Sequence, residues 1–171
     1  MKPSAWLVLL WLAGTTSASA ATAKANLRGT QPDSTLSGTV SLTDSSEGLK
    51  LSARLINAPP GAHGFHIHEF GSCDDAGKAA GSHYNPDQVK HGFMLKDGLT
   101  GAHAGDFGNL EVGSDGTGTL ELTLPNLTVS GPSYNVAGRA VILHEKPDDF
   151  SQPTGNAGSR IGCGAILITE H

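Results

Sequence analysis

The chain of 171 residues lacks any hydrophobic run long enough to cross a membrane as a helix. Its longest mostly apolar stretch, residues 5–13, is about nine residues long, whereas a membrane-spanning helix needs roughly 20. It also lacks runs of like charge, and its 11 basic residues are outnumbered by 16 acidic ones. A net negative chain is a poor partner for nucleic acid or for an anionic membrane, so we expect neither to be bound.

The apolar stretch instead indicates a cleaved signal peptide over residues 1–20. Lys2 supplies the positive charge at its start, and Ala18 and Ala20 supply the small residues of a cleavage site. Cleavage after Ala23 is the alternative. No cysteine lies beside the cleavage site, so we expect no lipid anchor. Residues 21–171 then form one domain of 151 residues with 10 basic and 16 acidic side chains, a net charge of −6.

Cysteine is scarce, since Cys73 and Cys163 are the only two. An exported protein meets an oxidising compartment, which favours a single disulfide between them; two unpaired thiols are the alternative. The bond would close a loop of about 90 residues. The chain-entropy model gives such a loop a stabilisation of roughly 4–5 kcal/mol.

Aromatic residues and helical periodicity are also scarce, whereas glycine and two-residue alternation are abundant. In residues 49–55, leucine and alanine alternate with polar side chains, and Asp115-Gly116 is typical of a hairpin turn. The pattern predicts about eight strands, near residues 23–28, 36–43, 49–57, 62–69, 105–112, 117–124, 138–144 and 162–170. Short strands separated by glycine and proline predict an all-β antiparallel barrel or sandwich.

Two segments, residues 70–103 and 146–161, interrupt this pattern with long stretches that show no clear periodicity. Structureless connections of this length are uncommon inside a compact domain and are usually functional. We therefore expect two long functional loops that are ordered by something other than a strand ladder.

The histidines indicate what orders these loops, because seven of the eight fall between residues 63 and 144. Residues two apart on a strand point to the same face, so His66 and His68 project together while Phe65 and Ile67 point into the core. The pair therefore predicts a metal site outside the barrel wall. His144 ends another strand and can add a third nitrogen. A site rich in imidazole suits copper or zinc.

A second candidate site lies in the first long loop. It consists of three histidines and a carboxylate, spaced too widely for one helix or strand: His83, His91, His103 and Asp106. This donor set matches a closed tetrahedral zinc site, and binding of the metal would order the loop. Solvated loop histidines are the alternative.

The motifs around these residues resemble the copper/zinc superoxide dismutase family. Residues 61–71 (GAHGFHIHEFG) resemble the first signature of that family, and residues 155–164 (GNAGSRIGCG) resemble the second. The segments 81–86, 90–92, 103–106 and 144–146 follow in the family order between them. The resemblance covers essentially the whole mature chain.

The resemblance implies an eight-stranded Greek-key β-barrel of the immunoglobulin-like sandwich type, with one copper ion and one zinc ion per chain. The implied copper ligands are His66, His68, His83 and His144. The implied zinc ligands are His83, His91, His103 and Asp106, so that His83 bridges both ions. Asp148 would link His66 to His91, and Cys73 and Cys163 would form the disulfide that ties the loop to the last strand.

The implied activity is the dismutation of superoxide, the substrate, to dioxygen and hydrogen peroxide by cycling of copper between Cu(II) and Cu(I). The implied catalytic residues are Arg160, beside copper, and His83, which takes up and returns a proton. Because the chain is negatively charged overall, Arg160, helped by Lys146, must attract the anion locally.

Two departures from the eukaryotic pattern resemble the bacterial envelope branch of the family. The segment 146–159 is short and carries few charges, and Cys73 lies early in the loop. Together with the signal peptide they predict a periplasmic enzyme, either a monomer or a homodimer. Outside the metal sites, we expect a structural hydrogen bond for His63 and solvent exposure for His171 and Asp149.

Three other functions were weighed. A metal-storage or metal-delivery module would lack part of the copper set or the arginine, and both are present in this chain. A hydrolytic zinc enzyme needs an open zinc position and a general base, whereas the zinc set here is closed. A copper-only dismutase would not retain His91 and Asp106.

Overall fold

Alternating apolar and polar side chains give the chain eight strands. The computed structural model describes residues 20–170, so residues 1–19 of the predicted signal peptide and His171 lie outside the described residues. The strands are β1 (Thr22–Gly29), β2 (Ser37–Ser45), β3 (Gly48–Ile56), β4 (Gly61–His68), β5 (Asp106–Val112), β6 (Gly118–Leu124), β7 (Ala140–His144) and β8 (Arg160–Glu170). All eight predicted strands are confirmed, each end within two residues.

The strands form one closed antiparallel barrel in the order β1-β2-β3-β6-β5-β4-β7-β8, with β8 pairing again with β1. The chain passes from β3 over to β4, which lies between β5 and β7, and this crossing makes the barrel a Greek key. Asp115-Gly116 turns the chain between β5 and β6, where Gly116 adopts a φ of 77° that favours glycine. The predicted fold is confirmed.

The barrel interior is filled by the inward-facing half of each strand. In β3 the inward residues Leu49, Leu51, Ala53 and Leu55 are buried, whereas Lys50 and Arg54 are exposed. Such alternation produces a one-sided apolar face that is stable only when the sheet closes on itself. Because the core of the described barrel is built from apolar side chains of this kind, a cluster of several polar side chains is expected on the outer wall.

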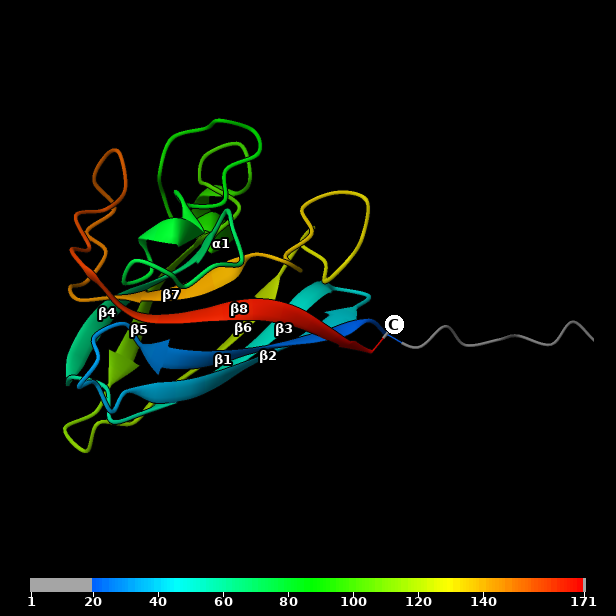
Figure 1. Cartoon of the computed structure of the whole chain (residues 1–171). Helices are drawn as coiled ribbons and strands as arrows, with labels where there is room; N and C mark the ends of the chain where they lie inside the picture. The colour runs from blue at the N-terminus through cyan, green and yellow to red at the C-terminus, as the bar shows by residue number, and fades with distance from the viewer. Residues whose placement is uncertain (1–19, 171) are drawn as a thin grey trace, which may run out of the picture.

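The two long loops gather on one side of this wall. Figure 1 draws residues 70–105 in green and 146–159 in orange on the side of β4 and β7, with β1 and β2 on the other side. The first loop contains only two short helices, η1 (Lys78–Ala80) and α1 (Met94–Asp97). No helix among the described residues has the length and apolarity to cross a membrane.

A small second core lies beneath the first loop, formed by Ala80, Ala140, Ile142 and Cys163. Cys163 of β8 is bonded here to Cys73 of the loop, with their Cα atoms 5.7 Å apart. The predicted disulfide is therefore present, and together with the apolar contacts it fastens the loop to the barrel.

Candidate metal centre

Strand register places three histidines on the outer wall of the barrel. Along β4, Phe65 and Ile67 are fully buried in the core, and His66 and His68 project from the opposite face, as the alternation predicted. β7 pairs with β4 so that Phe65 is opposite Leu143. This register brings His144, the last residue of β7, beside the histidine pair.

A fourth histidine from the first loop completes a group that we call the four-histidine cluster: His66, His68, His83 and His144. One nitrogen of each ring lies within 4.8 Å of those of the other three. The Nδ1 atoms of His68 and His144 face the carbonyl oxygens of Gly81 and Gly158 at 3.0 and 3.2 Å. A carbonyl only accepts, so both Nδ1 atoms donate, and the lone pairs of the Nε2 atoms face each other across 3.3 Å. That arrangement is unfavourable without a cation.

A second group, which we call the carboxylate cluster, lies on the loop side of the first. It consists of His83, His91, His103 and Asp106, whose ligand atoms also lie within 4.8 Å of one another. Asp106 is fully buried at the start of β5, and its Oδ2 accepts backbone N–H groups of Gly92 and His103 at 3.1 and 3.0 Å. Its Oδ1 lies 2.8 Å from His83 Nδ1 and 3.1 Å from His103 Nδ1.

His83 belongs to both clusters. Its Nδ1 faces Asp106, which leaves Nε2 as the nitrogen available to the four-histidine cluster. Its ring centre lies 4.2 Å from that of His66. The loop reaches this position by pairing with the end of β4: Tyr84 N–H donates to Ile67 O, and Glu69 N–H donates to Ser82 O. One imidazole therefore has a nitrogen directed at each cluster.

Asp148 connects the clusters from behind. Its Oδ2 accepts from His66 Nε2 at 2.8 Å, and its Oδ1 accepts from His91 Nε2 at 2.9 Å. In the neutral form of each ring the proton therefore lies on Nε2 and Nδ1 carries a lone pair, and both Nδ1 atoms are buried without a hydrogen-bond partner. His91 Nδ1 lies only 2.8 Å from Asp106 Oδ2, yet makes no hydrogen bond to it. Bare, convergent nitrogen atoms of this kind fit metal ions, and Asp148 fixes the rings that carry them.

Burial keeps three members of the four-histidine cluster, His68, His83 and His144, neutral. Desolvation lowers the pKa of His83 to about 4 and that of His144 to about 3. The pKa of His68 is also lowered by burial and by its histidine neighbours. Neutral imidazoles keep a lone pair for metal binding, so these three rings can bind a cation across the neutral pH range.

The carboxylates reverse this effect in the other cluster. Burial lowers the pKa of His91, but Asp106 and Asp148 outweigh it and raise the pKa to about 9. Burial raises the pKa of each aspartate, but the close ring nitrogens of His103, His83 and His91 at Asp106, and of His66 and His91 at Asp148, hold both values well below the ordinary range. Asp106 therefore stays ionised inside the carboxylate cluster, and its buried negative charge suits a divalent ion.

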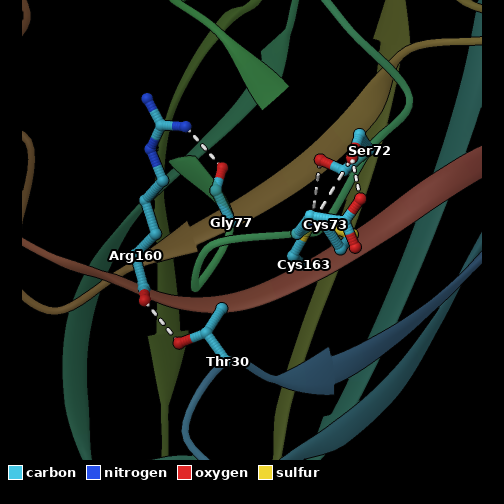
Figure 2. The surroundings of a disulfide bond; sticks show 7 residues. Thr30, Ser72, Cys73, Gly77, Arg160 and Cys163 are labelled. Carbon is cyan, nitrogen blue, oxygen red and sulfur yellow. Dashed lines mark hydrogen bonds between the residues drawn. A yellow bond between two sulfur atoms is a disulfide. The ribbon is translucent and has the colours of Figure 1, made fainter. Parts of the chain in front are cut away.

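Arg160 lies at the open side of the four-histidine cluster. A pocket of about 220 Å³ is lined by this arginine together with His68, His83 and His144. The guanidinium donates to the carbonyl oxygens of Gly77 and Gly81 at 2.5 and 2.6 Å, and Figure 2 shows the contact with Gly77 close to the disulfide. No carboxylate among the described residues pairs with it, so its charge remains available to an anion.

The structure adds three positioning residues that the sequence did not indicate. Gln152 pairs reciprocally with the backbone of His91, accepting its N–H at 3.0 Å and donating to its carbonyl at 2.8 Å. Asn109 pairs in the same way with the backbone of Asp148. A Cβ on Gly155 would lie 1.8 Å from Asp148 Oδ1, so only glycine fits there. None of the three belongs to a metal-ligand residue type, so no spacing pattern marks them.

The remaining polar predictions also have clear positions. Both ring nitrogens of His63 lie 2.8 Å from carbonyl oxygens, those of His144 and Pro59, which confirms a structural role. Asp149 is exposed and pairs with Ser151 and Asn156. Lys146 is exposed at the start of the second long loop.

Comparisons with known proteins agree with this geometry. The model of the family "Copper/zinc superoxide dismutase (SODC)" matches residues 36–166. Superoxide dismutase [Cu-Zn] 2 of Brassica juncea is 38% identical over 137 residues, which are 75% of this chain and 88% of that protein. The extracellular superoxide dismutase [Cu-Zn] of Caenorhabditis elegans is 38% identical over 142 residues, 79% of this chain and 62% of that protein. The crystal structure of the clock protein EA4 has a TM-score of 0.76 and 32% identity, covering 91% of this chain and 99% of its own.

Proposed function

The chain belongs to the copper/zinc superoxide dismutase family, and from this premise we propose which of its residues carry out the reaction and where the enzyme works. The enzyme converts two superoxide anions and two protons into dioxygen and hydrogen peroxide, with one copper ion and one zinc ion as cofactors. The assignment of the individual residues and the cellular location are our own.

We assign copper to the four-histidine cluster and zinc to the carboxylate cluster. The proposed copper ligands are His66, His68, His83 and His144. The proposed zinc ligands are His83, His91, His103 and Asp106. An all-imidazole site suits copper, and a closed set of three imidazoles and one carboxylate suits zinc. The unpartnered Nδ1 atoms of His66 and His91 support this division, because a bound ion would satisfy one in each cluster.

Copper supplies the one-electron redox chemistry, and zinc supplies charge and order without redox chemistry. The protein has to bring a small anion to this site although its own net charge after cleavage is −6. Arg160 does so locally, because its guanidinium borders the pocket, has no carboxylate partner and cannot lose its charge at neutral pH. We propose that Arg160 holds superoxide beside the copper ligands.

His83 supplies a proton-carrying atom. Its Nδ1 is fixed toward Asp106, so Nε2 is the nitrogen that can hold a proton when it is not bound. Burial lowers the pKa of this ring to about 4, so without a metal it carries one proton and not two at neutral pH. We propose that His83 Nε2 delivers one of the two protons that the second superoxide needs and that water supplies the other, so that hydrogen peroxide leaves.

One observation carries this proposal: His83 has one nitrogen at each cluster. A hydrolytic zinc enzyme would need an open zinc position, and the carboxylate cluster is closed by four protein groups. A storage module would need neither a shared ring nor an unpaired arginine at the pocket.

The test combines metal analysis with a superoxide-decay assay on the purified mature chain. We expect close to one copper and one zinc per chain and rapid decay. Arg160→Ala should lower the rate constant about tenfold, or roughly 1.4 kcal/mol, while copper stays bound. Arg160→Lys should restore part of the rate and Arg54→Ala, a distant arginine, should leave it unchanged. Full activity in Arg160→Ala would contradict the assigned role.

We propose that residues 1–20 are a signal peptide and that residues 21–171 form the mature enzyme. The disulfide between Cys73 and Cys163 supports an oxidising destination, and one relative is an extracellular enzyme. After expression in a bacterium, mild osmotic shock should release a chain that begins at residue 21. A full-length chain retained in the cytoplasm would contradict export.

A periplasmic location and membership of the bacterial branch rest on the shorter second loop and the early position of Cys73. In this location the enzyme would protect the cell envelope from superoxide. A homodimer remains one of two predicted states, and light scattering of the purified chain distinguishes it from a monomer.

A further inference from the structure

The outer face of β1, β2 and β3 is positively charged in a chain that is otherwise acidic. Residues 20–170 contain 10 basic and 16 acidic residues, yet these three strands carry four bases and a single acid, Asp44. The four bases are exposed: Lys24, Arg28, Lys50 and Arg54. Asp44 lies near the end of β2, where its carboxylate accepts the N–H of Val129. The charge of this face is therefore concentrated and of one sign.

The register of the strands shapes this face into a trough. The outward side chains of the central strand, β2, are all small hydroxyls: Ser37, Thr39, Ser41 and Thr43. Longer side chains flank them, because Arg28 is opposite Ser37 on one side and Arg54 is opposite Thr39 on the other. The hydroxyls form the floor and the bases form the walls. At a rise of about 3.4 Å per residue, this floor extends for roughly 20 Å along β2.

The trough deepens at one end into a groove of about 390 Å³. Arg28 and Arg54 both line the groove, together with Asn26, Ser37 and Thr39. None of the four bases on this face takes part in an ion pair with another described residue. The nearest acid on the neighbouring strand β6, Glu121, is opposite Ser52 and accepts its hydroxyl at 2.5 Å. The two guanidinium groups are therefore free to bind an external anion.

We propose that this trough binds a linear acidic polysaccharide. The forked guanidinium groups of Arg28 and Arg54 suit its carboxylate or sulfate groups, and the amide and hydroxyls of the floor suit its sugar hydroxyls. A flat membrane surface does not reach a recessed floor. No aromatic side chain lines the groove to stack on a base, which disfavours single-stranded nucleic acid.

The position of the trough leaves the metal centre free. β1–β3 lie across the barrel from β4 and β7, which carry the metal-binding histidines (Figure 1). A polymer bound there would hold the enzyme at an acidic surface while the pocket beside Arg160 stays open. Catalysis and attachment are therefore separable in experiments on the same protein.

The test measures binding of the metal-loaded mature enzyme to heparin, a sulfated polymer, and to polygalacturonate, a carboxylated one. Titration calorimetry at low salt should detect binding to at least one of them, with affinity falling as salt rises. Arg28→Ser/Arg54→Ser should weaken this binding about tenfold. The matched control Lys78→Ser/Lys96→Ser removes the same charge elsewhere and should change it less than twofold. Dismutase activity should be unchanged in both, which also shows that both are folded.

A third variant separates the shape of the trough from its charge. Thr39→Gln fills the floor without altering charge and should weaken binding several-fold. Absence of binding by the wild type to both polymers would overturn the proposal, as would an equal loss in the lysine control. Binding to phosphatidylglycerol vesicles with the same dependence on Arg28 and Arg54, and stronger than to either polymer, would assign the face to membranes instead.

Discussion

The four-histidine cluster and the carboxylate cluster share His83 but are built by different parts of the chain. Three of the four residues in the first lie on β4 and β7, whose pairing is set by the barrel. In the second, three of the four come from the loop between β4 and β5, and only Asp106 begins a strand. The first cluster is therefore formed by the sheet itself, whereas the second depends on how a long loop folds.

This difference separates two functions of the metal centre. Strand-borne imidazoles are held in place before a metal binds, which suits a centre that must react without rearranging. Loop-borne ligands gain order from the ion, which suits a structural site. The disulfide, Asp148 and Gln152 all act on the loops, and each reduces the disorder that zinc would otherwise have to overcome.

The largest expected effect comes from removing a ligand of the strand-borne cluster. His68→Ala should lower the superoxide-decay rate by about 1000-fold or more, equivalent to roughly 4 kcal/mol, because copper loses a nitrogen that no neighbour replaces. Zinc should remain near one per chain and the melting temperature of the zinc-loaded protein should change little. Loss of zinc together with activity would show that the clusters are not separable as described.

The loop-borne cluster should respond in the opposite way, through stability. Asp106→Ala removes a buried carboxylate that accepts two backbone N–H groups, at a cost of about 3–5 kcal/mol. We expect loss of zinc, a melting temperature lower by roughly 10 °C, and faster hydrogen exchange confined to residues 70–105. Asp33→Ala, an exposed acid, is the control. An unchanged exchange rate in that loop would contradict its dependence on the metal.

A smaller effect is expected from the residue that holds the backbone of His91. Gln152→Ala should speed the release of zinc to a chelator about tenfold, in the range typical of residues that orient a metal ligand. Gln152→Glu keeps the acceptor for the N–H of His91 but not the donor to its carbonyl. Its rate of zinc release should therefore lie between those of the wild type and Gln152→Ala. Release of copper should be unaffected, since both side-chain hydrogen bonds of Gln152 go to His91 of the loop-borne cluster. If Gln152→Ala speeded the release of copper and zinc by the same factor, Gln152 would not act on the loop-borne cluster alone.

The smallest expected effect is a difference between the two clusters in the number of protons released when a metal binds. With a pKa of about 9, His91 is protonated at pH 7 in the metal-free protein, so binding of zinc must displace about one proton from it. The affinity for zinc should then rise about tenfold per pH unit as the pH approaches 9. When zinc binds alone, His83 and His144, with pKa values of about 4 and 3, are already neutral and release no proton; a second ion at His83 Nε2 would displace the one proton that this ring still holds. Calorimetry in two buffers of different ionisation enthalpy measures the number of protons released when zinc binds. Asp148→Asn should reduce that number.

The sequence predicted the barrel and the members of the two clusters better than the groups that support them. Alternation was sufficient for the strands, since the inward residues of β3 could be identified without any knowledge of β2 or β6. The pair His66 and His68 followed from the same two-residue period. His83, His91 and His103 could be grouped only by residue type and by resemblance to a family, because a loop has no period that fixes its geometry.

The contacts that hold the second loop against the first loop and against β5 could not be predicted at all. Gln152 and Asn109 act through their carboxamide groups on the backbone of distant residues, and such a pairing leaves no pattern along the chain. The hydroxyl-floored trough was equally hidden, because Ser37 and Thr39 become a floor only when β1 and β3 lie beside them.

The most direct test of the account is a crystal structure of the metal-loaded mature chain with anomalous scattering recorded at the copper and zinc edges. We expect two ions on opposite sides of the His83 ring, copper at Nε2 among His66, His68 and His144, and zinc at Nδ1 beside Asp106. A single ion, or a His83 ring that contacts only one of two ions, would contradict the shared-ring centre on which the proposed mechanism depends.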